Sequence, residues 1–503
     1  MPKKVLIANR GEIAVRIIRA CRELNIETVA VYSEADRLAP HVWLADEAYQ
    51  IGPARAAESY LSIVRLLNAA HRSGCDAIHP GYGFLAENAD FAGAVESEGL
   101  TFIGPTAETI ALMGDKTAAR RAMEAAGVPV VPGTREALAD LDAVRSSCQE
   151  IGYPVLLKAA AGGGGKGMRR VEREADLKSA WDGARREAQA AFSDARVYVE
   201  KYLQRPRHIE FQVLADTHGN LIHLNERECS IQRRHQKLIE ESPSPVMTPE
   251  LRQQMGEQAV AAARGANYRG AGTIEFMVVG DQFYFLEMNT RLQDEHPVTE
   301  MVTGVDLVHA QLRIADGQAL GEQPVEPRGH AIECRINAED PYNGFLPAGG
   351  RIEQLRVPGG PGVRWDSGIV HGTEIGLHYD PLIAKLIVHA SDRAGAIERM
   401  ARALDELLID GVATIAPFHR RVMDDKDFRT GQFHTGYLDE HPELLAGRPG
   451  DESMRAVAIV AALLEDGQRK QVRVDNSQGS NDAESGWRRP GGGWSARGWS
   501  LRS

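Results

Sequence analysis

The 503-residue sequence predicts an α/β and α+β protein with three domains and a disordered tail, in line with ~100–200 residues per domain. Strand and helix patterns alternate over the first ~110 residues, which predicts a doubly wound parallel sheet. Strands with few helices dominate the middle of the chain and favour an antiparallel α+β unit. The end of the chain, residues 468–503, is rich in Gly, Ser, Arg, Asp and Asn, a composition typical of disorder.

The first predicted domain, residues 1–113, opens with a βαβ unit. Val5–Ala8 is a short apolar strand, a segment with helical apolar spacing follows, and Thr28–Tyr32 is a second strand. Strands at Ala77–His79 and Phe102–Ile103 continue the alternation. Because successive strands are joined through helices, they are expected to run parallel.

The second predicted domain, residues 114–328, begins with a helix at Lys116–Ala126 that has Asp115 as its N-cap. A Gly-Val-Pro-Val-Val-Pro-Gly segment then ends the helix. The expected strands are Val155–Lys158, Gly167–Val171, Val197–Tyr202, His208–Ala215, Leu221–Asn225, Gly272–Val279 and Gln282–Asn289.

The third predicted domain, residues 329–445, mixes strands with a helix near Arg393–Leu408. After it, residues 446–503 comprise a helix at Glu452–Leu464 and the low-complexity tail. This tail is either disordered without function or a docking segment that orders on a partner. The second alternative is suggested by the Trp and Arg residues that are interspersed in it.

Composition excludes several functional classes. The net charge is −12, so the chain lacks the overall basic character of a nucleic-acid-binding protein. No apolar stretch approaches the ~20 residues needed to span a membrane, and the N-terminal apolar run is too short for a signal peptide. The five scattered cysteines predict reduced thiols in a cytoplasmic protein rather than disulfides or a zinc site.

The first pattern with chemical content is the glycine-rich segment of residues 161–168. Its backbone can approach a ligand closely and direct N–H groups at phosphate oxygens, and Lys158 and Lys166 add positive charge. It is not a P-loop, because no Gly-Lys-Ser/Thr follows. A flexible linker is the alternative interpretation.

The second pattern is a row of polar residues at every odd position from 287 to 295, namely Glu287, Asn289, Arg291, Gln293 and Glu295. Alternate side chains of an extended chain share one face. Glu287 and Asn289, with Glu275 from the preceding strand, offer oxygen ligands suited to Mg²⁺. Arg291 offers a fork for a planar anion. A solvated strand face with compensating charges would show the same pattern.

The third pattern is the basic run from Glu226 to Lys237, which is either an anion subsite or an exposed basic loop. Together the three patterns supply a phosphate cradle, metal-binding carboxylates and several cations. This is the equipment for phosphoryl transfer from ATP, which depends on positioning and charge neutralisation.

The chain resembles the biotin carboxylase subunit of biotin-dependent carboxylases, a member of the ATP-grasp superfamily. The resemblance covers residues 1–445 and rests on the segments IANRGEI (7–13), HPGYGFL (79–85), MGDK (113–116), the glycine loop, residues 226–237, residues 287–300 and ECRINAEDP (333–341). It implies a pre-ATP-grasp N-terminal domain, an ATP-grasp domain whose glycine loop forms a mobile lid (about 131–204), and a C-terminal mixed α+β domain.

The resemblance also implies a role for each matching residue. ATP binding is implied for Lys116, Lys158, Gly163, Gly164, Gly165, Lys166, Gly167, Glu200, Lys201, Leu203, His208, Gln232 and His235. Ligation of two Mg²⁺ or Mn²⁺ ions is implied for Glu275, Glu287 and Asn289, and bicarbonate binding for Lys237, Arg291, Gln293, Asp294 and Glu295. The biotin residues are Tyr82, Gly83 and Arg335, the catalytic ones Arg291, Glu295, Lys237 and Arg335, and a dimer interface includes Arg16, Arg19 and Glu23.

The implied reaction is ATP-dependent carboxylation of biotin by bicarbonate, through carboxyphosphate. None of the 12 Met residues is followed by Lys, the dipeptide at which carriers attach biotin. A separate biotin carrier protein and carboxyltransferase subunits are therefore the expected partners, together with a second copy in a homodimer.

Asp294 departs from the family, which usually has Val at this position. The period-2 argument points its side chain away from the polar row, beside Leu292. A charge there would repel bicarbonate by ~1–4 kcal/mol at about 4 Å, which predicts weakened bicarbonate use. The alternatives are a catalytically impaired nucleotide-binding subunit or another ATP-grasp ligase that joins a carboxylate to an amine.

Overall fold

The structure, a computed structural model, describes residues 1–446 except 139, 160–167, 193–194 and 322–325, and also residues 459–463. Residues 1–446 form one unit and residues 447–503 a second one. Residues 459–463 are helical, in agreement with the predicted helix Glu452–Leu464. The rest of that helix and the low-complexity tail lie outside the described residues.

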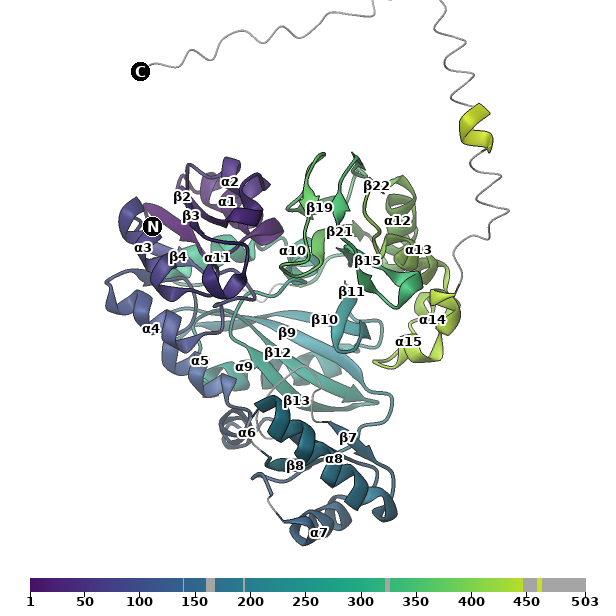
Figure 1. Ribbon diagram of the computed structural model, residues 1–503. Helices are drawn as coiled ribbons and strands as arrows, with labels where there is room; N and C mark the ends of the chain where they lie inside the picture. Colours follow the sequence, from purple (N-terminus) through teal and green to yellow (C-terminus); the bar gives the residue numbers. More distant parts are fainter. Residues whose placement is uncertain (139, 160–167, 193–194, 322–325, 447–458, 464–503) are drawn as a thin grey trace, which may run out of the picture. The chain divides into compact units, whose positions relative to one another are not determined.

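A five-stranded parallel sheet forms the N-terminal region, with strand order β3-β2-β1-β4-β5 (Figure 1). Its strands are β1 (Lys4–Ile7), β2 (Glu27–Ser33), β3 (Glu47–Gly52), β4 (Ala77–His79) and β5 (Thr101–Phe102). Val5 and Ile7 pack with α1 (Gly11–Glu23) in one apolar cluster, whereas Leu6 packs in another with residues of α3 (Ile63–Ser73) and α4 (Ala89–Ser97). Helices therefore cover both faces of the sheet, and the doubly wound prediction is confirmed.

An eight-stranded antiparallel sheet continues through the second and third predicted domains, with strand order β13-β12-β9-β10-β11-β14-β21-β19. Its strands are β9 (Arg207–Ala215), β10 (Leu221–Arg233), β11 (Gln236–Ser242), β12 (Gly270–Val279), β13 (Gln282–Asn289), β14 (His330–Asn337), β19 (Val363–Ser367) and β21 (Leu382–Ala390). β11 pairs with β14, with Ile239 opposite Cys334. This pairing joins the two domains in one sheet and confirms the predicted antiparallel α+β architecture.

A smaller sheet, with order β7-β6-β8, corresponds to the predicted lid. Its strands are β6 (Val155–Ala159), β7 (Arg169–Val171) and β8 (Val197–Lys201). With α7 (Leu141–Ile151) and α8 (Glu174–Phe192), it encloses its own apolar cluster, which includes Leu157, Trp181 and Val199. The glycine loop that joins β6 to β7 lies outside the described residues.

Several helices begin at a residue whose side chain caps the first turn. Asp115 caps α6 (Lys116–Ala125) by accepting hydrogen bonds from the backbone N–H groups of Thr117 and Ala118, as predicted. The predicted helix near residue 393 is α12 (Arg393–Glu406). The remaining helices that pack on the large sheet or its edges are α5 (Ala107–Gly114), α9 (Pro249–Gly265), α10 (His296–Thr303), α11 (Leu307–Ala315), α13 (Ala416–Asp424), α14 (Lys426–Arg429) and α15 (Tyr437–Glu440).

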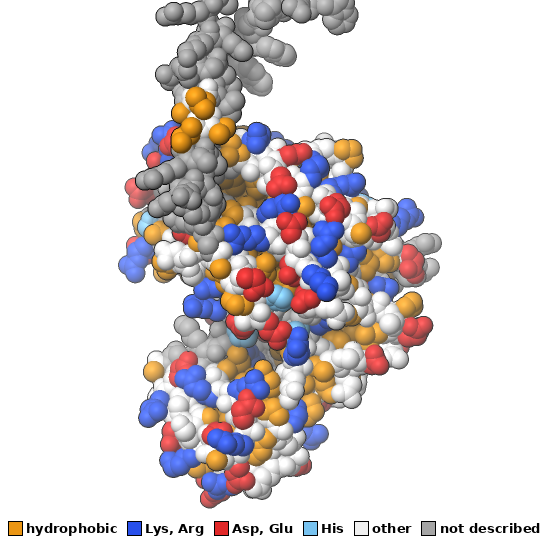
Figure 2. Space-filling view, turned by 90° about the vertical axis from the view of Figure 1, so that its right-hand side faces the viewer, with side chains coloured by type: hydrophobic (Ala, Val, Ile, Leu, Met, Phe, Trp, Pro, Cys, Tyr) orange, Lys and Arg blue, Asp and Glu red, His pale blue; other side chains and the backbone are white. Residues whose placement is uncertain are grey.

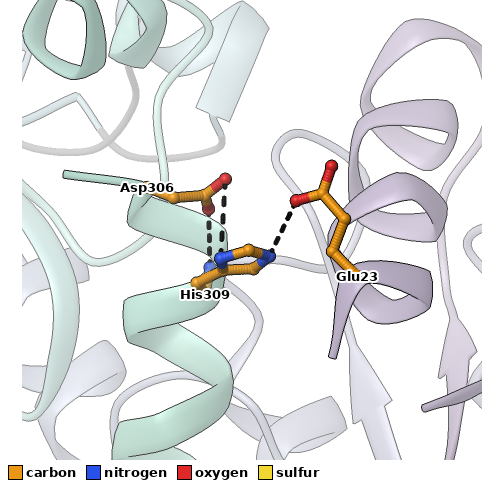
Figure 3. A group of neighbouring side chains, drawn as sticks. All are labelled: Glu23, Asp306 and His309. Carbon is orange, nitrogen blue, oxygen red and sulfur yellow. Dashed lines mark hydrogen bonds and ion pairs between the residues drawn. The ribbon is translucent and has the colours of Figure 1, made fainter. Parts of the chain in front are cut away.

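Ion pairs join the N-terminal region to α10 and α11. The buried Arg16 guanidinium of α1 lies 2.8 Å from both Glu300 and Asp306. Figure 3 shows the His309 ring of α11 between Asp306 and Glu23, with its Nε2 atom 3.3 Å from the Glu23 carboxylate. Arg16 and Glu23 thus both have partners inside their own chain, although Glu23, like Arg19, is exposed.

Glu241 of β11 links the large sheet to α12. Its buried carboxylate contacts His330 Nε2 at 2.6 Å and Arg393 Nε at 2.7 Å. Burial opposes ionisation, but the hydrogen bond from His330 and the charge of Arg393 outweigh it and lower the pKa of Glu241 to about 2.

Replacing Glu241 with Gln should lower the free energy of unfolding by about 3–5 kcal/mol at pH 7, because the Arg393 guanidinium loses its buried carboxylate partner. A depressed carboxyl pKa stabilises the fold above its ordinary value of 4.5, and this contribution disappears as the pH falls toward about 2. Urea denaturation should therefore show the two proteins converging below pH 4.5. Glu406→Gln, which removes the exposed ion pair with Arg402 on α12, is the control. If the difference in the free energy of unfolding between E241Q and the unaltered protein stays constant down to pH 3, the ionised Glu241 carboxylate is not the cause.

Candidate active site

A cleft of about 1230 Å³ is lined by residues of the small sheet and of the large sheet. The space-filling view shows a hollow between two parts of this unit, with His and charged side chains gathered around it (Figure 2). Predicted site residues that line the cleft are Lys116, Lys158, Glu200, Lys201, Leu203, His208, Gln232, His235, Lys237, Glu275, Glu287, Asn289, Arg291, Gln293, Asp294, Glu295 and Arg335. Gly163, Gly164, Gly165, Lys166 and Gly167 lie outside the described residues.

The predicted metal ligands lie on two neighbouring strands. Glu275 of β12 pairs in register with Glu287 of β13, and Asn289 donates to the Glu275 carboxylate at 2.9 Å. The surrounding protein and the charge of Glu275 raise the pKa of Glu287. This crowding of carboxylate and amide oxygens at a solvent-filled cleft fits Mg²⁺, which binds hard oxygen ligands and would relieve the repulsion.

Lys237, on β11, connects several carboxylates of the site. Its ammonium contacts three carboxylates: Glu210 at 2.6 Å, Glu275 at 2.9 Å and Glu295 at 2.5 Å. Burial alone would lower the pKa of Lys237, but the three carboxylates together raise it well above its usual value. Lys237 therefore stays charged and joins the metal-ligand strands to the segment that carries Glu295.

Arg227 is the largest completely buried side chain among the described residues. Its five N–H groups are all engaged, by Glu210, Gln212, Thr273, Gln293 and Thr299, at 2.5–3.0 Å. The residues of the predicted basic run thus lie in two different environments, one buried and one exposed. Arg227 supports the site from inside the sheet, while Arg234 and His235 form the exposed two-residue turn between β10 and β11.

Arg335 of β14 binds three carboxylates through its three nitrogens. Nε donates to Glu240 at 2.6 Å, Nη1 to Asp294 at 2.6 Å and Nη2 to Glu295 at 2.8 Å. Burial raises the pKa of Glu240 to about 7, against the charge of Arg335. In contrast, Lys237 and Arg335 overcome burial at Glu295 and lower its pKa well below the usual value. Glu295 is therefore an ionised carboxylate in a buried place.

Arg291 closes the site on the side of the N-terminal region. Its Nε donates to Glu87 at 3.0 Å, and its Nη2 lies 3.4 Å from the Asn289 oxygen. The guanidinium thus borders both the metal-ligand residues and the segment that leads to Glu295.

The polar row converges on the cleft, as predicted, but not as one extended strand. β13 ends at Asn289, and Glu295, the N-cap of α10, has the non-extended dihedrals φ −81° and ψ 8°. The expectation that Asp294 points away from the row is wrong, because its carboxylate reaches Arg335. The period of 2 holds only while the chain remains extended, and here it turns before α10.

The predicted nucleotide residues gather around the small sheet and the β10–β11 hairpin. The Lys158 ammonium contacts Glu200 at 2.5 Å, within the cleft. His208 Nε2 lies 2.8 Å from the Glu275 carboxylate, so the nucleotide and metal residues share a boundary. Arg234 and His235 both have positive φ, which gives the tight turn that brings this hairpin to the cleft.

Of the predicted biotin residues, Tyr82 is connected to the Asp294 segment through Lys385, and neither Tyr82 nor Gly83 lines the cleft. The Tyr82 hydroxyl donates to Glu12, and its ring lies 5.7 Å from the buried Lys385 ammonium. Lys385 in turn donates to the backbone oxygen of Asp294 at 2.7 Å.

Sequence reasoning missed six residues that support the site: Glu12, Glu87, Glu210, Glu240, Gln212 and Lys385. The only signal was that Glu210 and Gln212 occur at alternate positions of a predicted apolar strand. Glu87 and Lys385 carry no local signal, because their partners are remote in the sequence.

Three family descriptions match successive parts of the chain. They are "Biotin carboxylase, N-terminal domain" at residues 1–110, "Carbamoyl-phosphate synthase L chain, ATP binding domain" at residues 115–323 and "Biotin carboxylase C-terminal domain" at residues 333–440. The biotin carboxylase of Haemophilus influenzae is 54% identical over 443 residues, which are 88% of this chain and 99% of that protein. The chain belongs to the biotin carboxylase family.

Other relatives agree with this assignment. A pyruvate carboxylase subunit of Methanothermobacter thermautotrophicus is 55% identical over 443 residues, 88% of this chain and 90% of that protein. The biotin carboxylase domain dimer of Hydrogenobacter thermophilus 2-oxoglutarate carboxylase, in complex with MgADP, ADP and bicarbonate, superposes with a TM-score of 0.84 at 51% identity, covering 89% of this chain and 99% of that one.

The predicted family, fold class and enzyme class are confirmed: the chain is an ATP-dependent biotin carboxylase. The matches to the N- and C-terminal biotin carboxylase domains leave no support for another ATP-grasp ligase. Among the described residues, no helix has the length and apolar character needed to cross a membrane. The five cysteines, all in described residues, are buried and free, as predicted.

Replacing Arg227 with Met should lower the free energy of unfolding at pH 7 by about 3–5 kcal/mol, because a buried carboxylate loses its guanidinium partner. Because Met retains the aliphatic volume, the loss of stability measures the contribution of the charge and of the five N–H donors. Urea denaturation is the measurement. Lys178→Met, which removes an exposed pair with Asp182 on α8, should change stability by less than about 0.5 kcal/mol. Equal losses in the two variants would contradict the supporting role of Arg227.

Proposed function

We propose that this biotin carboxylase activates bicarbonate at Glu295 and transfers the carboxyl group to biotin beside Arg335. The observation that carries the proposal is the position of the ionised Glu295 carboxylate between Lys237 and Arg335, in a cleft shared with Glu275 and Arg291. A general base must be ionised and within reach of its substrate, and Glu295 is buried yet held in its charged form.

ATP binds between the small sheet and the β10–β11 hairpin in this proposal. Lys116, Lys158 and the glycine loop from Gly163 to Gly167, including Lys166, hold the phosphates. Residues from Glu200 to Leu203 bind the adenine, and His208, Gln232 and His235 contact the ribose and phosphates. Glu275, Glu287 and Asn289 hold two Mg²⁺ or Mn²⁺ ions, which neutralise phosphate charge when bound.

Bicarbonate binds among Lys237, Arg291, Gln293 and Glu295. Glu295 accepts the bicarbonate proton, and a bicarbonate oxygen attacks the γ-phosphorus of ATP. The bond from that phosphorus to the bridging oxygen of ADP breaks, which yields carboxyphosphate and ADP. Lys237 and Arg291 offset the negative charge of the attacking oxyanion.

Carboxyphosphate then breaks into CO₂ and phosphate next to biotin, near Tyr82 and Gly83. The phosphate accepts the N1′ proton of biotin, and Arg335 stabilises the negative charge that develops on the ureido oxygen. The N1′ nitrogen attacks CO₂ to give carboxybiotin. Because Arg335 contacts Glu295, the base and the enolate-stabilising group are held in one network.

The proposed partners are a biotin carrier protein and a carboxyltransferase on separate chains, with a cytoplasmic location. A relative of this chain forms a dimer of biotin carboxylase domains, and we propose a homodimer that uses the region of Arg16, Arg19 and Glu23. Relatives of similar identity belong to carboxylases of pyruvate and of 2-oxoglutarate. This range supports selection of the final acceptor by the carboxyltransferase.

The test is ADP formation by the purified chain, which should require bicarbonate and be stimulated by free biotin. Glu295→Gln should lower kcat by about 10²–10⁴-fold, the contribution of a general base. Binding of MgADP, measured by calorimetry, should be unchanged because Glu295 lies outside the proposed nucleotide site. ADP formation that ignores bicarbonate, or an E295Q variant with normal kcat, would refute the proposal.

Replacing Glu287 with Gln should raise the Mg²⁺ concentration that gives half-maximal ADP formation by about tenfold or more, because one anionic ligand is lost. The measurement is a Mg²⁺ titration at fixed total ATP. Glu374→Gln, an exposed carboxylate on the short strand β20 (Glu374–Ile375), is the control and should leave the titration unchanged. If the Mg²⁺ titration curve of E287Q is not shifted, Glu287 is not a metal ligand.

A further inference from the structure

We propose that the Asp294 carboxylate is an internal competitor for Arg335, occupying the guanidinium position that an oxyanion substrate must take. This inference rests on the proposed role of Arg335. The oxyanion has two sources in the reaction: the ureido oxygen of biotin as it gains negative charge on Arg335, and bicarbonate, which binds next to Arg335 at Glu295.

The Asp294 carboxylate contacts Arg335 as a substrate oxyanion would. Its Oδ2 atom lies 2.6 Å from Nη1, at the distance of a charge-assisted hydrogen bond. The Asp294 side chain is 21% exposed, whereas the other two carboxylates on Arg335, those of Glu240 and Glu295, are 0% and 2% exposed. Asp294 is therefore the most exposed of the three carboxylates on Arg335, and the one that a solute in the cleft can displace.

Arg335 does not need Asp294 to stay in position. Glu240 on Nε and Glu295 on Nη2 already define the plane of the guanidinium from two sides. Two contacts on different nitrogens orient a rigid planar group. The third carboxylate therefore adds charge at Nη1 without being required for orientation.

The backbone of Asp294 is anchored, so its side chain stays near Arg335. The completely buried Lys385 ammonium donates to the Asp294 carbonyl oxygen at 2.7 Å and pairs with Glu12 at 2.9 Å. Displacing the Asp294 carboxylate thus requires only a side-chain rotation at the cleft. Its charge also contributes to the raised pKa of Tyr82 and of Arg291, so it acts on a proposed biotin residue and on a proposed bicarbonate residue.

Asp294→Asn tests the proposal, because Asn keeps the size of the side chain but lacks the charge. We expect the KM for bicarbonate, for free biotin or for both to fall by about three- to tenfold, the value of a partly exposed charged contact. The substrate whose KM falls identifies the competing oxyanion. Asp294→Glu retains the carboxylate and should keep both KM values near those of the unaltered enzyme.

Asp439→Asn is the matched control. It removes a carboxylate from exposed Asp439 on the rim of the same cleft, at α15, and should leave both KM values unchanged. A readout without turnover is the rise in melting temperature when bicarbonate or biotin is added to the MgADP complex, which should be larger in D294N.

The outcomes separate the two proposals. If neither KM falls in D294N and neither ligand stabilises it more than the unaltered enzyme, the competitor role is overturned. If D439N or D294E lowers the same KM to the same extent, the effect is not specific to the charge on Arg335, and the role is again overturned. Failure of the unaltered enzyme to show bicarbonate-dependent ADP formation would instead refute the proposed function.

Discussion

The Lys237 ammonium, surrounded by three buried carboxylates, organises the whole site. A buried charge is costly unless it is paired, and two of the carboxylates around Lys237 also pair with an arginine. Glu210 reaches Arg227, and Glu295 reaches Arg335. The result is a chain of alternating charges in which moving one member would leave another unpaired.

The large antiparallel sheet makes this arrangement possible. Glu210 lies directly opposite Arg227 on β10 and opposite Glu275 on β12, so three charged residues form a row across adjacent strands. Cross-strand neighbours on one face of a sheet are only ~5 Å apart, the spacing at which such side chains interact. The residues of the site come from distant parts of the sequence, yet strand register sets their separations. Because β11 pairs with β14, the same sheet also brings Arg335 to the row.

Local geometry departs from the commonest patterns where the sheet meets the cleft. The β10–β11 turn consists of Arg234 and His235, both with positive φ, where Asn-Gly would be the usual choice. A non-glycine residue in this region costs about 1–3 kcal/mol, and such strain concentrates at functional sites. Asp294 is a second departure: an anion beside the guanidinium that, in the proposed mechanism, stabilises another anion. If the sequence served stability alone, other residues would be expected both in this turn and at position 294.

Features that depend on near neighbours could be predicted from the amino-acid order: the N-cap at Asp115, the bounds of β13, the alternation typical of a doubly wound domain, and the residue types of the polar row. The motifs were also enough to indicate the family. Which charges meet became visible only in the folded chain. Arg227 belongs to a basic run that fitted either an anion subsite or an exposed loop, but it is enclosed by the sheet. Lys385 reaches the Asp294 backbone across 91 residues. Asp294 itself was misplaced because a period of 2 was extended beyond the end of β13. Local periodicity carries no information on strand pairing or on where an extended segment turns, and these long-range contacts fix the partners of every buried charge in the site.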